Sequence, residues 1–246
     1  MFKQIFPRST ITANTIALVS AFAISLGLAA SKSYSDDTVT TTKKEKVATL
    51  AGGCFWCTEA CFERMKGVNA VVSGYIGGHV PNPTYEQVIG MNSGHAEAVQ
   101  VYYDPSKVTY EELLQLFFKI HDPTTLNRQG ADTGPHYRSS IFYHDDAQKR
   151  IATEHIKKLD KELVNPIVTK LEKATKFYPA EEYHQDYFRK NPNAGYCRAV
   201  VAKKVRDTTV VLAVKGKLKT EAATETVNGN GNVIGNGNGI IIENGN

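Results

Sequence analysis

Apolar and polar positions alternate with two different periods between residues 47 and 206. Segments in which every second residue is apolar are typical of half-buried strands, and segments with apolar residues three or four positions apart are typical of helices. The predicted strands span residues 47–50, 68–75, 96–103, 140–143 and 167–171. The predicted helices span residues 54–66, 84–89, 109–120, 145–163 and 180–189. Strands and helices mixed in this order predict an α+β fold of packed layers.

Local signals define some of these boundaries and the extent of the domain. Thr109 is followed three residues later by Glu112, which is the spacing of a capping box at a helix start. Residues 208–214 predict one more short strand. The periodic region, residues 47–206, suits one domain of roughly 150 to 200 residues. A chain of that length can bury a core without disulfide bonds.

The first thirty residues have the order of a secretory signal peptide. Lys3 and Arg8 precede an apolar stretch at residues 16–30, which ends in small residues. This order predicts export to the periplasm or to the medium. An uncleaved membrane anchor is the alternative, although the apolar run of about 15 residues is shorter than the roughly 20 that a membrane span needs.

Two further segments lack the periodicity of the domain. Residues 31–46 are polar and rich in Thr and Lys, which is typical of a linker. Residues 215–246 become rich in Gly and Asn, and such a composition buries little apolar area. We therefore predict a disordered tail. An adhesive or repeat segment is the alternative.

Composition narrows the class of protein. The 246-residue chain is 41% hydrophobic and 22% charged, which is ordinary for a globular protein. Its formal net charge of +4 comes from 29 basic and 25 acidic residues that are dispersed along the chain, so nucleic acid is not an expected partner. Four cysteines are too few for a disulfide scaffold but sufficient for redox chemistry.

Cys54 is the main candidate for chemistry. It follows Gly52 and Gly53 at a predicted transition from strand to helix, and Phe55 and Trp56 come directly after it. A thiol at a helix start faces unpaired N–H groups and the positive end of the helix dipole, which favour the nucleophilic thiolate. A buried cysteine among core aromatic residues is the alternative interpretation.

Cys57 and Cys61 lie three and seven positions after Cys54, on one side of the predicted helix. Cys54 and Cys57 match a C-x-x-C redox pair. The three thiols could instead bind a metal, but the sequence offers no obvious fourth ligand. We expect Cys61 to be a core residue.

Several other segments carry polar groups that suit a substrate site. Glu97 begins an apolar strand, and a partly buried carboxyl group can donate a proton near neutral pH. The alternative is a solvent-facing residue on the strand. Tyr85 lies in a predicted loop region, and Asp132 and Tyr137 lie in an irregular loop at residues 127–138. Cys197 follows Gly195 and Tyr196, and a mobile cysteine there could resolve a sulfenic acid.

These segments, taken together, resemble the type A peptide methionine sulfoxide reductases. The resemblance extends in order from residue 47 to residue 205. It rests on the segments 53–56, 74–78, 81–85, 94–99, 121–123, 128–132, 137–139 and 180–187. It implies a two-layer α+β sandwich around a mixed β-sheet.

The resemblance also implies a mechanism. Cys54 would attack the sulfoxide sulfur, and Glu97 would protonate the oxygen with the help of Tyr85 and Tyr137. Phe55 and Trp56 would hold the S-methyl group, and Asp132 would order the site, through water. The Cys54 sulfenic acid would then form a disulfide with a second thiol, for which thioredoxin is the reductant.

The same resemblance implies the substrates and partners. The substrate would be the S epimer of methionine sulfoxide, protein-bound or free. The enzyme would be a monomer without a metal or organic cofactor. Two departures from the family pattern stand out. His136 replaces an expected glutamine, and Cys57 stands where many members have glycine. The expected resolving thiol is Cys197, with Cys57 as the alternative.

Two other functions fit part of the pattern. A general thiol–disulfide oxidoreductase would use Cys54 and Cys57 and would not need Glu97. A binding module for methionine-rich partners would show no turnover, and it would keep its affinity when Cys54 is replaced.

Overall fold

A computed structural model describes residues 45–220, 225–227 and 233–235 of the chain. Its centre is a six-stranded sheet with the strand order β7-β6-β1-β3-β2-β8. The strands are β1 (Lys46–Gly52), β2 (Val68–Ile76), β3 (Ala96–Tyr103), β6 (Ser139–Tyr143), β7 (Lys170–Lys173) and β8 (Tyr178–Pro179). Strands β6 and β7 are parallel and the other neighbours are antiparallel, so the sheet is mixed as predicted.

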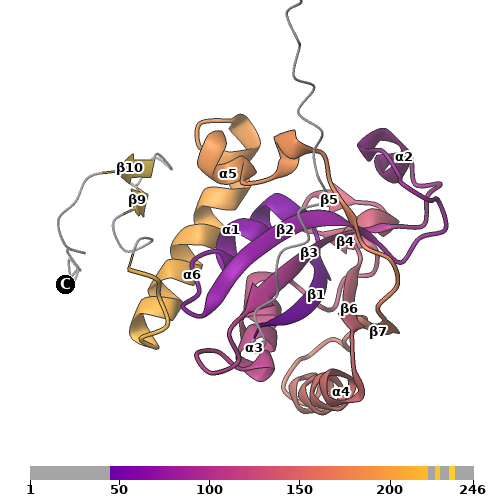
Figure 1. The fold of residues 1–246 in the computed structure, drawn as a ribbon, viewed down its shortest axis with the longest axis horizontal. Helices are drawn as coiled ribbons and strands as arrows, with labels where there is room; N and C mark the ends of the chain where they lie inside the picture. The colour runs from indigo at the N-terminus through magenta and orange to yellow at the C-terminus, as the bar shows by residue number, and fades with distance from the viewer. Residues whose placement is uncertain (1–44, 221–224, 228–232, 236–246) are drawn as a thin grey trace, which may run out of the picture. The chain divides into compact units, whose positions relative to one another are not determined.

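The helices are α1 (Phe55–Phe62), α2 (Tyr85–Ile89), α3 (Tyr110–Ile120), α4 (Asp146–Asp160), α5 (Tyr187–Lys190) and α6 (Ala202–Val214). The main core lies between the sheet and the group α1, α3 and α6, and it includes Phe62, Leu113 and Leu212 (Figure 1). A second, small apolar cluster forms around Ala51, Ile76 and Phe142. The predicted α+β layer fold is therefore confirmed.

Most predicted elements occur close to their expected bounds. The capping box at α3 is present: the Glu112 N–H donates to Thr109 Oγ1, and the Thr109 N–H donates to Glu112 Oε2. The irregular loop contains the short hairpin β4 (Arg128–Gln129) and β5 (Asp132–Thr133), followed by the helical turn Pro135–Tyr137. The strand expected at 167–171 begins later, at Lys170.

Two predictions near the end of the domain are wrong. The helix expected at 180–189 is broken into the turn Glu182–His184 and α5, because Asp186 adopts a left-handed conformation with φ of 55°. The strand expected at 208–214 is the C-terminal half of α6. This helix buries Thr208 and Leu212, four positions apart, so packing overrides the strand preference of its β-branched residues.

The segment after α6 is paired with the domain. Met65 and Leu218 form an antiparallel bridge, and the backbone of Lys217 accepts a hydrogen bond from Lys66 N–H. The first residues that the sequence assigns to the tail therefore extend the fold. Farther on, β9 (Glu225–Val227) pairs with β10 (Val233–Gly235). The signal peptide at 1–30, the linker up to residue 44 and most of the tail lie outside the described residues.

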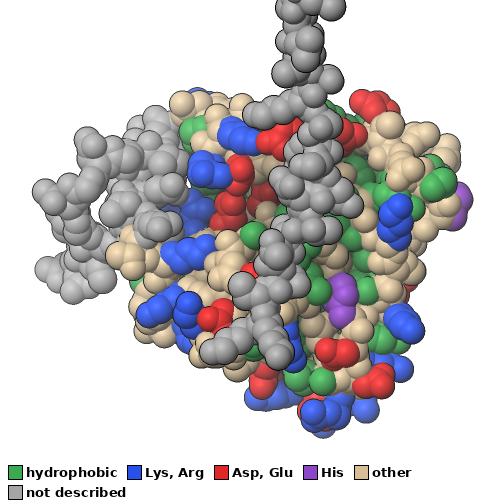
Figure 2. Space-filling model, in the orientation of Figure 1, with side chains coloured by type: hydrophobic (Ala, Val, Ile, Leu, Met, Phe, Trp, Pro, Cys, Tyr) green, Lys and Arg blue, Asp and Glu red, His purple; other side chains and the backbone are tan. Residues whose placement is uncertain are grey.

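The described surface carries charges of both signs. Figure 2 shows acidic and basic side chains interspersed over the visible face. None of the helices in the described part of the chain has the length and apolar character that a membrane span requires.

Candidate active site

Cys54 lies where β1 ends and α1 begins. It is the residue before the first helical position, with φ of −53° and ψ of 123°, and its carbonyl accepts the Cys57 N–H at 3.1 Å. Gly53 permits this turn with φ of +89°, and a Cβ at that position would approach Gln129 to 2.6 Å. The Cys54 side chain thus sits at a helix start, as predicted, and only 8% of its surface is exposed.

The protonation state of Cys54 differs from the expectation of a thiolate. Burial raises the pKa of the Cys54 thiol well above its usual value, and the neighbouring Cys57 thiol raises it further. Tyr196 and the backbone N–H of Trp56 oppose the rise only in part. Desolvation outweighs the helix start here because the site excludes water. In the substrate-free protein Cys54 is therefore a neutral thiol near pH 7.

Glu97 approaches the same helix start from β3. Its side chain is 1% exposed, and Oε2 accepts the Phe55 N–H at 3.0 Å. Burial raises the pKa of Glu97 well above its ordinary value, and the nearby Cys54 adds to the rise, whereas the Phe55 N–H lowers the pKa. The shift favours the neutral carboxyl group, which is the form that can donate a proton. The alternative of a solvent-facing residue is wrong.

Two tyrosines lie near enough to the pair for the charges of Glu97 and Cys54 to affect their pKa values. Burial is the main cause that raises the pKa of Tyr85 to about 12, and the charges that Glu97 and Cys54 can carry add to the rise. The same causes raise the pKa of Tyr137. Both hydroxyls keep their protons at physiological pH, so each can donate a hydrogen bond. Asp132 accepts a direct hydrogen bond from the Tyr196 hydroxyl.

The aromatic residues after Cys54 form a packed cluster. Phe55 is 1% exposed, and Trp56 is partly buried. The Tyr187 ring stacks on the Trp56 indole at 3.7 Å between centroids and 8° between planes. Trp56 Nε1 donates a hydrogen bond to His184 Nδ1 at 3.1 Å. Phe55 and Trp56 therefore belong to one packed cluster with His184 and Tyr187.

Sequence reasoning missed the roles of three residues in this site, namely His184, Tyr187 and Tyr196. His184 and Tyr187 belong to the segment 180–187 and Tyr196 precedes Cys197, so the motifs included them. Their positions became clear only from the structure. His184 and Tyr187 pack against Trp56. Tyr196 interacts with Asp132 and Cys54.

The other three cysteines are buried free thiols. Cys61 is a core residue as expected, since it is 0% exposed and its sulfur accepts a hydrogen bond from Thr208 Oγ1 at 3.3 Å. Cys197 is also 0% exposed and begins the five-residue helical segment Cys197–Val201, which continues into α6. The cysteine that the sequence offers as a mobile resolving thiol therefore lies buried in a helical segment. In the described part of the chain, no three His, Cys, Asp or Glu side chains form a group that could hold a metal.

A cavity of about 80 Å³ lies on the side of Cys54 that faces Cys57. Its lining consists of Cys54, Cys57, Gln129, Gly130, Ala131, Asp132, Val200 and Lys204. A larger groove of about 570 Å³ lies between α3 and α6, but none of its lining residues belongs to the thiol site. The smaller cavity is therefore the one that borders the chemistry.

Comparisons with known proteins agree with this geometry. The family model for peptide methionine sulfoxide reductase matches residues 46–215. Peptide methionine sulfoxide reductase MsrA 1 of Rhodopirellula baltica is 71% identical over 168 residues, which cover 68% of this chain and 88% of that protein. The enzyme MsrA of Thermus thermophilus is 55% identical over 161 residues, which cover 65% of this chain and 92% of that protein.

Solved structures show the same fold. Reduced Mxr1 of Saccharomyces cerevisiae matches with a TM-score of 0.59 and 40% identity, over 64% of this chain and 91% of that one. Methionine sulfoxide reductase A of Corynebacterium diphtheriae matches with a TM-score of 0.57 and 35% identity, over 64% of this chain and 80% of that one. The fold and the buried thiol define a thiol-dependent oxidoreductase. The chain belongs to the peptide methionine sulfoxide reductase family.

Proposed function

We propose that Cys54 is the nucleophile and Glu97 the proton donor of a methionine sulfoxide reductase. The activity itself follows from membership of the family: the chain is an oxidoreductase that reduces methionine sulfoxide to methionine. One contact carries the assignment of the two roles. The backbone N–H next to Cys54 binds the buried carboxyl of Glu97 at 3.0 Å, which brings the thiol and the acid to one helix start.

The proposed first step transfers the sulfoxide oxygen. Cys54 attacks the sulfoxide sulfur, the S–O bond breaks, and the oxygen takes a proton because an unprotonated oxide is a poor leaving group. The protonated oxygen passes to the Cys54 sulfur as the bond between the two sulfurs breaks, so methionine leaves with reduced sulfur and Cys54 is oxidised to sulfenic acid. Tyr85 and Tyr137 donate hydrogen bonds to the oxygen, while Phe55 and Trp56 contact the methyl group.

The raised pKa values of both reacting groups define where the protons are. The raised pKa of Glu97 favours its protonated form, which the donor role requires. The proton of the Cys54 thiol must leave as its sulfur attacks, so it replaces the one that Glu97 gives to the oxygen. Glu97 gives one proton while Cys54 loses another, so the acid and the nucleophile act in the same step.

The next step forms a disulfide and releases water from the sulfenic acid. Cys57 borders the same cavity as Cys54, and Cys54 lies outside the regular helix, so a bond to Cys57 needs no unwinding of α1. Burial raises the pKa of Cys197 to about 11, so its thiol is protonated near neutral pH. We therefore propose that Cys57 reacts first and that Cys197, whose pKa also responds to Cys54, follows as a relay thiol.

We further propose the S epimer of free and protein-bound methionine sulfoxide as the substrate, thioredoxin or a similar dithiol protein as the reductant, and a monomer as the working unit. The type A motifs support the epimer, and the buried thiols support a dithiol protein as the final reductant. We also propose export, because residues 1–30 have a charged start followed by an apolar stretch, as a signal peptide does.

A direct assay tests the proposed function. The protein is incubated with a peptide that contains both epimers of methionine sulfoxide and with dithiothreitol. We expect complete loss of the S epimer and persistence of the R epimer. Reduction of insulin disulfides at a comparable rate, with Glu97→Gln fully active, would instead identify a general thiol–disulfide oxidoreductase.

A further inference from the structure

Two helix faces meet beside the thiol site with their residues in step. Cys57 and Cys61 lie four positions apart on α1, and Lys204 and Thr208 lie four positions apart on α6. Residues with this spacing share one face of a helix. Thr208 Oγ1 donates a hydrogen bond to Cys61 Sγ at 3.3 Å, and Lys204 lines the same cavity of about 80 Å³ as Cys57. Lys204 therefore lies opposite Cys57 in the way that Thr208 lies opposite Cys61.

The positive charge of Lys204 acts on the thiols of α1. Burial raises the pKa of the Cys61 thiol, and the hydrogen bond from Thr208 and the charge of Lys204 oppose this rise. Cys57 is one helical turn closer to the cavity that Lys204 lines. A lysine beside a thiol favours the thiolate, which is the nucleophilic form of cysteine.

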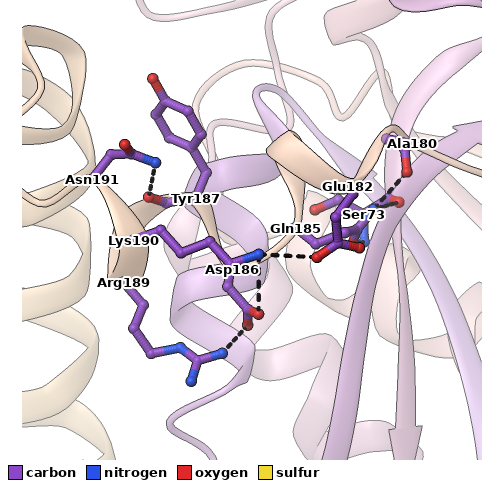
Figure 3. A network of polar contacts seen from close by, with 9 residues as sticks. All are labelled: Ser73, Ala180, Glu182, Gln185, Asp186, Tyr187, Arg189, Lys190 and Asn191. Atoms are coloured by element: carbon purple, nitrogen blue, oxygen red, sulfur yellow. Dashed lines mark hydrogen bonds and ion pairs between the residues drawn. The ribbon is translucent and has the colours of Figure 1, made fainter. Parts of the chain in front are cut away.

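The half-buried side chain of Lys204 has no acidic partner. Among the described residues it takes part in no hydrogen bond or ion pair. Other lysines of the domain do have such partners: Lys203 Nζ lies 2.7 Å from the carboxylate of Asp207, and Lys190 Nζ lies 3.2 Å from that of Glu182 (Figure 3). The charge of Lys204 is therefore not neutralised by an ion pair and acts on the cavity and its two sulfur atoms.

The other ionisable groups around the two thiols do not supply this positive charge. Asp132 lines the cavity with a carboxyl group, which has the opposite sign. Burial lowers the pKa of His121 to about 4, so its ring is neutral. Of the described residues that line the cavity, Lys204 is the only cation. The remaining ionisable groups near this pair of helices are Cys54, Cys61, Arg64, Tyr196, Cys197 and Asp207.

We propose that Lys204 assists the disulfide-forming step, in which its ammonium group stabilises the thiolate of Cys57. This inference rests on the proposed function, in which Cys57 attacks the sulfenic acid of Cys54. The Cys57 thiol loses its proton, the bond between the two sulfurs forms, and the S–O bond of Cys54 breaks. The leaving hydroxide gains a proton and departs as water, which balances the proton that Cys57 lost. The sulfenic acid is the oxidant, so the step needs no other.

The pH dependence of this step distinguishes an electrostatic role from a structural one. An opposite charge beside an ionisable group shifts its titration by about 1 to 3 pH units. Loss of the Lys204 charge should therefore move the rise of disulfide formation with pH upward by about one unit. Below that rise, each unit lowers the thiolate fraction about 10-fold. A purely structural role of Lys204 would instead lower the rate by the same factor at every pH.

Rapid quenching of a single turnover separates the two chemical steps. Release of methionine reports the reaction of Cys54, and the loss of thiols that can be alkylated, measured by mass, reports the disulfide. All proteins carry Cys197→Ser, so that the second thiol is Cys57. Lys204→Met removes the charge and keeps the length of the side chain, whereas Lys204→Arg keeps the charge. Lys203→Met is the matched control, because Lys203 lies on the same helix and pairs with Asp207 instead.

We expect Lys204→Met to slow disulfide formation about 10-fold at pH 7 and to approach the unsubstituted rate at high pH. Methionine release should change less than disulfide formation. Lys204→Arg and Lys203→Met should keep the unsubstituted pH profile. An unchanged profile in Lys204→Met would overturn the proposal, and so would a loss of equal size at every pH. If Lys204→Met does not fold, Lys204→Gln takes its place, and the same two outcomes decide.

A further variant separates this inference from the proposed function. Cys57→Ser, in the same Cys197→Ser protein, should block disulfide formation. If a disulfide to Cys54 still forms at the unsubstituted rate, the proposed role of Cys57 is wrong, and the role of Lys204 fails with it. If Cys57→Ser blocks the disulfide but Lys204→Met leaves the pH profile unchanged, Cys57 remains the resolving thiol and only the role of Lys204 fails.

Discussion

The backbone N–H of Phe55 donates a 3.0 Å hydrogen bond to the carboxyl of Glu97, across 42 positions of sequence. This contact places a buried acid from the middle of the sheet beside the thiol that begins α1. Burial raises both pKa values and so favours the neutral form of each group. The pair therefore brings together the acid that gives a proton to the sulfoxide oxygen and the thiol whose proton replaces it.

Glu97→Gln should slow sulfenic acid formation by about 10² to 10⁴-fold, which is the usual contribution of a general acid. Glutamine keeps the size and the acceptor for Phe55 N–H but has no proton to give. Single-turnover kinetics without a reductant measure this step. Glu162→Gln, on the exposed surface, is the control. An unchanged rate in Glu97→Gln would remove Glu97 from the mechanism.

The pH dependence should follow from the direction of the Glu97 shift. Its raised pKa means that the neutral acid persists above pH 4.5 and is lost only as pH rises through the folded value. In the wild type, loss of this acid should therefore lower the single-turnover rate at alkaline pH. Ionisation of Cys54 acts in the opposite direction, because it produces the nucleophilic thiolate. Glu97→Gln should lack this fall, and an alkaline fall of equal size in the variant would contradict the assignment.

Cys54→Ser should abolish reduction even with excess dithiothreitol, because a serine hydroxyl cannot replace the sulfur nucleophile. Cys61→Ala is the matched control, since Cys61 is a buried thiol of the same helix that contacts Thr208 in the core. It should keep its activity at temperatures where it stays folded. Residual activity of Cys54→Ser above about one per cent, a loss no larger than one general acid contributes, would place the nucleophile elsewhere.

Peptide mapping after one turnover without a reductant should identify a Cys54–Cys57 disulfide as the first product. Cys57→Ser should then slow disulfide formation, whereas Cys197→Ser should keep turnover with dithiothreitol and lose most of it with thioredoxin. Disulfide geometry requires Cα atoms within about 4.4 to 6.8 Å, which residues three apart at a helix start can meet. A Cys54–Cys197 bond as the first product would make Cys57 dispensable and Cys197 the resolving thiol.

Glu59→Gln should stabilise the protein above neutral pH. Glu59 is 1% exposed, one oxygen has no partner among the described residues, and burial raises its pKa to about 7. The folded state then binds more protons than the unfolded state between pH 4.5 and 7, so the unfolding free energy falls as pH rises through this window. The effect is up to about 3 kcal/mol at pH 8, at 1.4 kcal/mol per pH unit.

Urea unfolding at pH 5.5, 7 and 8.5 measures this effect. The nearby Glu63, whose pKa burial raises to about 8, contributes a slope of the same sign and remains in the variant. Glu162→Gln should leave the pH dependence as in the wild type. Equal stability of Glu59→Gln and the wild type at pH 8.5 would show that the carboxyl group is ionised and solvated there.

The sequence by itself determined the elements whose burial follows a local period. The strands near 47–50, 68–75, 96–103 and 140–143 and the capped helix at 109–120 formed as predicted, because alternation and a capping box act over a few neighbouring residues. The glycines before Cys54 likewise predicted a thiol at a helix start, since positive φ at Gly53 is a local requirement.

Only the tertiary structure decided the features that depend on contacts between distant segments. It broke the helix expected at 180–189, where Gln185 bonds to the backbone of β2 instead of continuing a helical turn. It made residues 208–214 helical by packing Thr208 onto Cys61, and it placed Cys197 in a buried helical segment. It also kept Cys54 protonated, because a pKa depends on how completely the whole fold excludes water, which no local pattern of residues specifies.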